Sequence, residues 1–259
     1  MSSLIPVHSA IPIASLKKIT RTLNDSISRV ASGLKVLGGN DAGSQSMANT
    51  LKAHSRSFSA AESNNQAGID LLELAESALL ELSALTTRLK ELGVADTLDT
   101  NDAHDTAALN AEAIAVSDTI DAVVSSLKYN TLSVFDTSAK TYTVGVDDAG
   151  NTQTVKTTVG IAATNITDAT GTNNSADTTL GEVTQSLGHV NGGLTALRAY
   201  RNVASTTAAH LLQAAHNLQD TDFALETAKL TKQSLLKNYA LAMVATANAG
   251  EIEKLRLLA

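Results

Sequence analysis

A heptad repeat over residues 180–218 constrains the fold of this chain more than any other feature of its sequence. Its a and d positions, three and four residues apart in turn, are Leu180, Val183, Leu187, Val190, Leu194, Leu197, Arg201, Ala204, Ala208, Leu211, Ala215 and Leu218. This spacing places a nearly continuous apolar stripe along one helix of about 58 Å. Such a stripe has to be buried, so the sequence predicts a bundle of long helices.

Helices that could pack against this one are predicted both before and after it in the sequence. Apolar residues recur at helical spacing in four further stretches. We expect helices at residues 13–37, beginning after Pro12, and at 42–93, 105–128 and about 223–249. Because short connections favour antiparallel neighbours, the fold class is mainly α, a long antiparallel helical bundle or coiled coil.

The period changes between residues 141 and 160. Tyr142, Val144 and Val146 alternate with small or polar residues, and Asp147 to Gly150 supplies a turn. This pattern predicts a small β-hairpin. The Thr-rich, low-complexity stretch 163–179 that follows is expected to be an exposed loop.

Two interruptions of the helical pattern, at residues 38–41 and 219–222, give the chain a palindromic layout. We expect residues 1–40 and 220–259 to pair as one domain and residues 41–219 to form a second. Charge follows the same division: 1–40 carry five Lys and Arg against one Asp, 220–259 carry five of each sign, and 41–219 carry nine basic against twenty acidic residues. The middle is acidic and the ends are not.

Composition narrows the function classes. An acidic surface repels phosphates, so no nucleic-acid partner is expected. The chain has no Cys, which leaves no disulfide framework and no thiol chemistry to propose. No uncharged apolar run approaches the roughly 20 residues that span a bilayer, so no membrane insertion is expected. The first sixteen residues do not have the pattern of a cleaved signal peptide.

No catalytic, cofactor-binding or metal-binding residue is predicted. The six histidines are scattered and form no His-Glu-x-x-His pair. Asp220 and Asp222 are expected to cap exposed helix amides, and Asp147 and Asp148 to serve a turn. The glycines Gly188, Gly192 and Gly193 follow no strand, so they favour close helix approach over phosphate binding.

Arg201 breaks the apolar stripe, and two interpretations of it remain open. The arginine could extend its head out of the core along its apolar stem. Alternatively it fixes the register of neighbouring helices or reaches a neighbouring subunit.

Both ends of the chain resemble the terminal signatures of bacterial flagellins. The N-terminal resemblance rests on the run from Arg29 to Val36 and on residues 40–43 and 47–48. Its family positions include Arg29, Ser32, Gly33, Leu34, Asn40, Asp41, Ala42 and Gly43. The C-terminal positions, in the family's order and spacing, include Asp220, Asp222, Phe223, Ala224, Glu226, Leu230, Ala242, Met243, Ala247 and Asn248. With residues 88–92 and 128–130, the resemblance covers nearly the whole chain.

This resemblance implies a structural subunit that polymerises into the extracellular flagellar filament for swimming motility, not an enzyme. The terminal domain would form an inner coiled-coil layer and residues 41–219 an outer helical layer, without variable outer domains. Implied partners are copies of the chain, the flagellar export apparatus, an export chaperone, and hook-junction and cap proteins. Export would occur without a cleaved signal peptide.

Two alternative functions are weighed against this one. A hook–filament junction protein has the same paired terminal helices and would differ in abundance. An enzyme embedded in a filament protein would need a catalytic constellation that the sequence does not contain. The resemblance also places a receptor-recognition surface of the family at Arg88 and Leu92.

Overall fold

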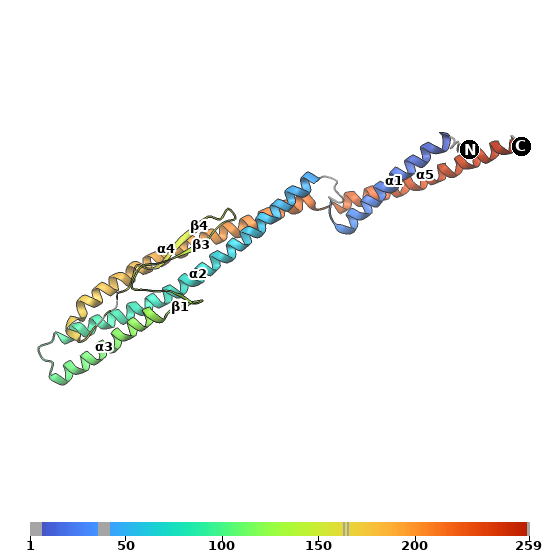
Figure 1. Cartoon of the computed structure of the whole chain (residues 1–259). Coiled ribbons are helices and arrows are strands. Elements are labelled where there is room, and N and C mark those ends of the chain that lie inside the picture. The colour runs from blue at the N-terminus through green and yellow to red at the C-terminus, as the bar shows by residue number, and fades with distance from the viewer. Residues whose placement is uncertain (1–6, 36–41, 163, 165, 258–259) are drawn as a thin grey trace. The chain divides into compact units, whose positions relative to one another are not determined.

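The described part of the chain forms five long helices and two small antiparallel strand pairs (Figure 1). The computed structural model describes residues 7–35, 42–162, 164 and 166–257. The helices are α1 (Val7–Ser32), α2 (Ala42–Asp96), α3 (Ala103–Ser126), α4 (Thr172–Gln219) and α5 (Phe223–Leu257). The strands are β1 (Lys128–Tyr129), β2 (Leu132–Ser133), β3 (Lys140–Gly145) and β4 (Thr152–Thr158), and a 3₁₀ turn η1 (Ala169–Gly171) precedes α4. The predicted fold class is confirmed.

The described residues fall into two compact units. The terminal unit comprises the chain up to Ala53 and from Leu211 onward, and the central unit comprises His54 to His210. Both boundaries lie inside helices, α2 and α4, whereas the sequence suggested division at the breaks near residues 40 and 220. The first turns of α2 belong to the terminal unit because they contact the end of α4 there, where Lys52 Nζ donates to Gln219 Oε1.

In the central unit, α2 and α4 pack antiparallel through the predicted apolar stripe. Two polar contacts show that the helices run in opposite directions, because a later residue of α2 contacts an earlier residue of α4. Ser55 Oγ donates to the Ala208 carbonyl oxygen at 2.8 Å, and Glu73 pairs with Arg198 at 2.8 Å. Every described a and d side chain from Leu180 to Leu218 is buried or half-buried. The heptad prediction is therefore confirmed. α3 covers the same core from the other side of α2, where Ala113, Ile120 and Val124 join it.

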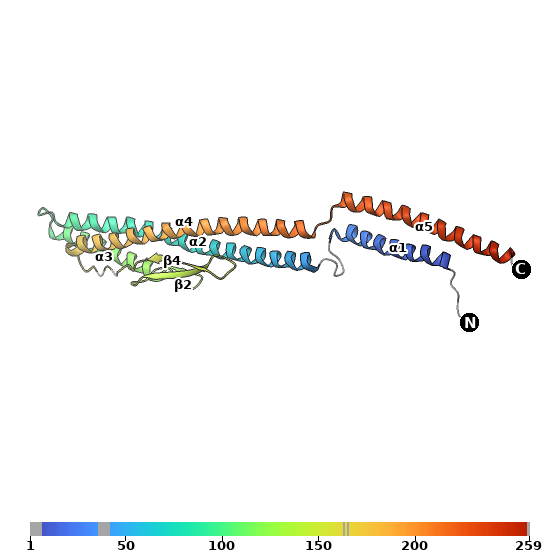
Figure 2. The same ribbon diagram turned by 90° about the horizontal axis from the view of Figure 1, so that it is seen from above.

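The predicted β-hairpin is present and lies along the bundle (Figure 2). Val144 and Val155 are buried where the hairpin meets the helices. A Cβ added to Gly68 of α2 would lie 2.9 Å from Val144 Cγ2, and one added to Gly193 of α4 would lie 3.5 Å from Val155 Cγ1. Glycine at these two positions therefore lets the hairpin come close to the helix backbones. The close helix approach expected of Gly188, Gly192 and Gly193 is found at Gly193, where a Cβ would lie 2.9 Å from Leu72 Cδ1 of α2, whereas nothing lies within 4 Å of a Cβ at the other two.

A second hairpin, β1–β2, was not predicted as a strand pair. Its two-residue turn, Asn130 and Thr131, has positive φ at both positions, 44° and 72°. Positive φ at both central residues is the geometry of a type I′ hairpin turn. The strands are two residues long, too short for a periodic signal in the sequence.

Arg201 acts within the subunit. Its guanidinium donates to Gln66 Oε1 on α2 at 2.6 Å, and the side chain is half-buried. The adjacent Asn65 is fully buried on the inner face of α2. The Asn65 amide group has no hydrogen-bond partner among the described residues, so the Arg201–Gln66 bond is, with that of Ser55, a polar contact across a mainly apolar interface. This contact supports the register interpretation of Arg201, because a polar layer pairs best in one alignment of two helices.

The expectation of an exposed loop over 163–179 is wrong for most of its length. The 3₁₀ turn begins at Ala169 and α4 begins at Thr172, eight residues before the heptad pattern. Ala169, Thr172, Ala176 and Thr179 are buried. Side-chain bonds fix this segment: Ala169 N donates to Asn110 Oδ1 at 2.7 Å, so α3 holds the start of the turn.

Several predicted helix ends also differ: the first helix ends at Ser32 and not at residue 37, the third spans Ala103–Ser126, and the last continues to Leu257. The first helix begins at Val7, not after Pro12, so Pro12 lies at its sixth position. The second helix continues past Gly93 to Asp96. Gly93 does not end the helix; it makes room for the start of α4. A Cβ added there would lie 1.9 Å from Thr172 Oγ1 and 2.9 Å from Asn173 Oδ1.

Replacing Gly93 with alanine should therefore destabilise the central unit. Thr172 cannot yield easily, because it is fully buried and its hydroxyl donates to the Ala169 carbonyl oxygen at 2.8 Å. We expect a loss of about 3 kcal/mol, high in the usual range for overpacking, and a drop in Tm of roughly 6–12 °C by circular dichroism. Gly181→Ala is the matched control, because nothing lies within 4 Å of a Cβ there. It should gain roughly 0.5–1 kcal/mol, and an equal response of both variants would contradict the argument.

In the terminal unit, α1 packs along α5. Large apolar side chains remain exposed on α5, where α1 does not cover them. They are Phe223, Leu225, Leu235, Leu236, Tyr239, Leu241, Met243 and Ile252. None of the helices in the described part of the chain is long and apolar enough to cross a membrane.

Candidate functional site

The two terminal signatures meet in a joint of the terminal unit, between the end of α1 and the start of α5. Backbone bonds tie the two chain segments together. Thr221 N donates to the Gly33 carbonyl oxygen at 2.9 Å, Lys35 N donates to the Gln219 carbonyl oxygen at 2.6 Å, and Leu34 forms a β-bridge with Asp220. Residues that are almost two hundred positions apart in the sequence thus form one structure.

Gly33 ends α1 in the left-handed conformation, with φ of 71°. Its amide donates to the Arg29 carbonyl oxygen at 2.8 Å, so this carbonyl in the last turn of the helix has a hydrogen-bond partner. Glycine is the usual residue at such a C-cap because it has no side chain to strain the backbone. The ring of Phe223 covers the position, 3.7 Å from where a Cβ would lie. The glycine of the N-terminal signature and the phenylalanine of the C-terminal signature are therefore in contact.

An ion pair crosses the joint from α1 to α5. Arg29 Nε lies 3.0 Å from Glu226 Oε1, and Lys229 Nζ lies 3.2 Å from the other carboxylate oxygen. The Glu226 side chain is 5% exposed and the Arg29 side chain 28%. Burial raises the pKa of Glu226, but the hydrogen bonds from Lys229 and Arg29 and the positive charge of Arg29 outweigh it, so the pKa lies below its ordinary value. Glu226 is therefore an anion that holds both helices.

The sequence predicted a capping role for both aspartates of the joint, and Asp222 has it. Its Oδ1 accepts from Leu225 N at 3.1 Å, the N-cap arrangement at the start of α5. Asp220 instead takes part in the β-bridge with Leu34, and its Oδ1 lies 3.6 Å from Nδ1 of His216 on α4. The two carboxylates do not form a pair for acid–base work.

The remaining signature positions lie away from the joint or beside it. Ala42 and Gly43 start α2, and Asn40 and Asp41 lie outside the described residues. Ser32 is exposed and its hydroxyl accepts from Leu34 N. The other C-terminal positions follow along α5, where Ala242, Met243 and Asn248 are exposed and Leu230 and Ala247 are half-buried; Ala224 is exposed in its first turn. Sequence reasoning missed Lys52, whose contact with Gln219 is made by a long side chain at a position with no sequence pattern.

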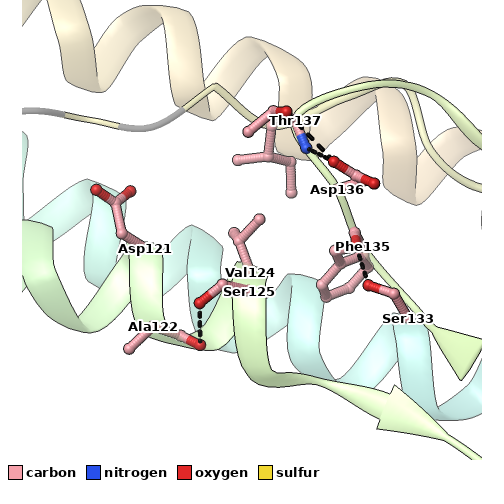
Figure 3. Close-up of a pocket in the computed structure, with 9 residues that line it drawn as sticks. Asp121, Ala122, Val124, Ser125, Ser133, Phe135, Asp136 and Thr137 are labelled. Atoms are coloured by element: carbon pink, nitrogen blue, oxygen red, sulfur yellow. Dashed lines mark hydrogen bonds between the residues drawn. The ribbon is translucent and has the colours of Figure 1, made fainter. Parts of the chain in front are cut away.

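A second candidate lies in the central unit, a cleft of about 510 Å³ between the end of α3 and the chain after β2 (Figure 3). Val124 and Phe135 form its apolar floor, and Asp121 and Asp136 stand at its rim. These polar groups already have partners. Asp121 Oδ1 accepts from Thr164 N at 3.0 Å. The hydrogen bond and charge of Lys140, and hydrogen bonds from Thr137, hold the pKa of Asp136 below its ordinary value. The cleft therefore shows no acid–base or nucleophile pair among its lining residues.

Metal binding has no support from the described residues, since no three His, Asp or Glu side chains in them converge on one point. The joint is thus the site at which residues from distant parts of the sequence converge.

Comparison with known proteins identifies the family to which this chain belongs. The family model of the bacterial flagellin N-terminal helical region matches residues 7–141, more than half of the chain. The chain belongs to the bacterial flagellin family. It is similar to the flagellin of Halalkalibacterium halodurans, at 30% identity over 89% of each chain. It is also similar to the flagellin of Bacillus subtilis, at 27% identity over 95% of this chain and 98% of the relative.

A solved structure is also similar to the chain. The crystal structure of Bacillus cereus flagellin matches with a TM-score of 0.42 and 22% identity, over 61% of this chain and 93% of that chain.

The receptor surface expected of flagellins at Arg88 and Leu92 is not a surface at Leu92. Leu92 is 2% exposed and belongs to the core of the central unit, so its side chain is not accessible to a receptor. Arg88 is exposed and binds Glu112 of α3 at 2.7 Å and Glu91 at 3.1 Å. Hydrogen bonds to Glu112 and Glu91 raise its pKa. Arg88 therefore links α2 to α3, and any role in recognition by a host receptor remains a proposal.

Proposed function

We propose that this chain is a structural subunit that polymerises with copies of itself into the extracellular bacterial flagellar filament. The observation that carries the proposal is the uncovered apolar surface of α5. Tyr239 and Leu241 are 70% and 46% exposed and lie two residues apart, which puts them on nearly opposite sides of the helix. One neighbour, α1, cannot cover both sides. Apolar area of this kind favours association, and copies of the same chain supply it in a homopolymer.

Family membership supports the same function. The relatives named above are called flagellin, and no observation favours the hook–filament junction alternative. We extend the proposal to the residues: the terminal unit would form the inner layer of the filament and the central unit the outer layer. The proposal also includes export through the flagellar apparatus without a cleaved signal peptide. The further partners would be an export chaperone and the hook-junction and cap proteins. No catalytic step is part of this function.

Reassembly of the purified protein tests the proposal. The full chain, dissociated by mild heating and cooled in the presence of filament seeds, should grow into long helical filaments visible by electron microscopy. A filament subunit should also be the main protein of filaments isolated from the source cells. Failure to elongate, together with isolated filaments made of another chain, would favour the junction alternative.

A further inference from the structure

The first half of α1 carries positive charge that no acid on the same stretch of helix balances. Lys17 and Lys18 are exposed, and residues 7–24 contain no Asp or Glu. Arg21 differs from the two lysines, because Asp25 lies one turn further along the helix. Lys17 and Lys18 therefore have no acidic neighbour on α1.

The helix that packs along α1 supplies no acid there either. Arg29, near the end of α1, meets Glu226 in the first turn of α5, so the two helices run antiparallel. Residues 7–24 therefore lie along α5 beyond Glu226. Residues 227–250 of α5 contain no Asp or Glu, and their charged residues are all lysines. This part of the terminal unit is cationic on both helices, so copies that crowd together through it repel one another unless an acidic surface lies between them.

An acidic surface of this kind runs along α2 in the central unit. Residues 57–87 contain no Lys or Arg, and their acids are Glu62, Asp70, Glu73, Glu76 and Glu81. Asp70 and Glu81 are exposed and lie on nearly the same side of the helix, about three turns apart. Glu73 pairs with Arg198 of α4, whereas Asp70 accepts from the neutral amide of Gln66. We call the exposed side marked by Asp70 and Glu81 the acidic face of α2.

The acids of α3 are mostly used within the subunit. Asp102 and Asp105 form the capping box at the start of the helix, and Glu112 binds Arg88 of α2. Asp118 is exposed and serves in the control below. The acidic face of α2 is therefore the better partner for a cationic helix.

We propose that Lys17 and Lys18 of one copy dock on the acidic face of α2 of a second copy, at Asp70 and Glu81, when the chain polymerises. The inference rests on the proposed filament function and names one contact between its subunits. Charge complementarity selects the partner, because each surface lacks the opposite charge along its own stretch of helix. The contact places an acidic surface beside the cationic stretch, which reduces the repulsion between crowded terminal units.

Charge reversal in the full-length chain tests the contact, with the residual subunit concentration after seeded growth as the readout. One variant carries Lys17→Glu and Lys18→Glu, and the other carries Asp70→Lys and Glu81→Lys. Each should raise the residual concentration about tenfold, because attractive contacts become repulsive and one exposed pair contributes a few-fold at most. The defect should shrink in 1 M salt, where the screening length falls to about 3 Å.

Mixing the two variants distinguishes a contact between copies from a contact within one copy. In an equimolar mixture, the reversed α1 of one variant can face the reversed α2 of the other. Growth should then recover to within about threefold of the wild type, and a single chain with all four changes should recover as well. Recovery of the four-change chain without recovery of the mixture would place the contact within one copy and overturn the proposal.

Asp99→Lys combined with Asp118→Lys is the matched control, because it makes the same change in charge at exposed acids outside α2. It should stay within about threefold of the wild type. An equal defect in this control, or a defect in the α1 variant alone, would overturn the proposal, since the lysines would then respond to net charge or meet another partner.

Failure of this contact and failure of the filament function give different results. Normal growth of both variants beside a growing wild type would overturn the docking contact alone. A wild type that does not grow would overturn the filament function and this proposal with it. Unchanged helical circular dichroism shows that each free variant is folded.

Discussion

Glu226→Gln should raise the free-subunit concentration at which filament growth stops by between one and two orders of magnitude. The carboxylate of Glu226 is almost fully buried and binds Arg29 across the joint and Lys229 beside it. A neutral amide leaves both cations without their charge partner. Removing one member of a buried pair costs about 3–5 kcal/mol, and partial exposure of Arg29 brings our expectation to roughly 2–3 kcal/mol. Each 1.4 kcal/mol is about tenfold in concentration.

The measurement is the residual subunit concentration after seeded growth. Arg21→Ala is the control, because it removes an exposed positive charge from the same helix, away from the joint. It should change the concentration by less than about threefold, as for other exposed charges. Arg29→Met combined with Glu226→Gln should cost less than the two changes added together, since neither partner is then left alone. Additive costs would mean that the pair does not act across the joint.

Acid should act on the wild type through the same carboxylate. The pKa of Glu226 lies below its ordinary value in the folded joint, so between the two values the unfolded segment binds more protons. Stability from this group is present above the ordinary value of about 4.3 and is lost as pH falls through the lowered folded pKa. Asp136 and Asp147, whose pKa values are also lowered, add a similar dependence elsewhere. The difference between wild type and Glu226→Gln should therefore shrink below about pH 4.

The helices were predictable because their apolar periodicity is long. The repeat from Leu180 to Leu218 has no competing strand pattern, and the structure buries it as expected. The β3–β4 hairpin was predictable for the opposite reason, since alternation and a turn sequence coincide there. Each of these elements carries its own signal in local sequence.

The start of α4 was not predictable because tertiary contacts decide it. Thr, Asn and Asp favour turns when they are exposed, and the stretch before Leu180 is rich in them. In the fold, Ala169 is held by Asn110 of α3, and Thr170 Oγ1 donates to Asp96 at the end of α2. Gly93 then opens the space that Thr172 fills. No single stretch of sequence contains this information.

The joint was recognisable only in part. The resemblance marks Arg29, Gly33 and Glu226 as family positions without saying that they meet. These residues meet only because the chain between them turns back on itself. In the Arg29–Glu226 ion pair the two residues are 197 positions apart in the sequence. The same limit explains the error at Leu92, where a match to a family surface position says nothing about burial in this chain.

The terminal helices of the free subunit should be cut by protease far faster than the central unit, and the filament should resist. Exposed trypsin sites are present on both terminal helices. They are Lys17, Lys18 and Arg21 of α1 and Lys229, Lys232 and Arg256 of α5. Among the sites of the central unit, Arg88 sits on a helix that packs on a large apolar core. Limited digestion should therefore trim both ends and leave a helical fragment close to residues 54–210, which should no longer polymerise.

The physical reason is the apolar surface that one subunit cannot cover. α1 supplies one neighbour for α5, while Tyr239 and Leu241 lie on opposite sides of it. Isolated helices are marginal in water, and most of their stability in proteins comes from packing of an apolar face. In the filament, terminal helices from several copies would bury these faces together and offset the entropy lost on ordering. The ends carry less net charge than the middle, +4 over residues 1–40 and 0 over residues 220–259 against −11 over residues 41–219, so they repel one another less when copies crowd together. Ordering and polymerisation would then be one event, with a rise in helical circular dichroism as filaments form. Termini in the free subunit that resist trypsin as long as the central unit would instead mean that filaments assemble from rigid, preformed subunits.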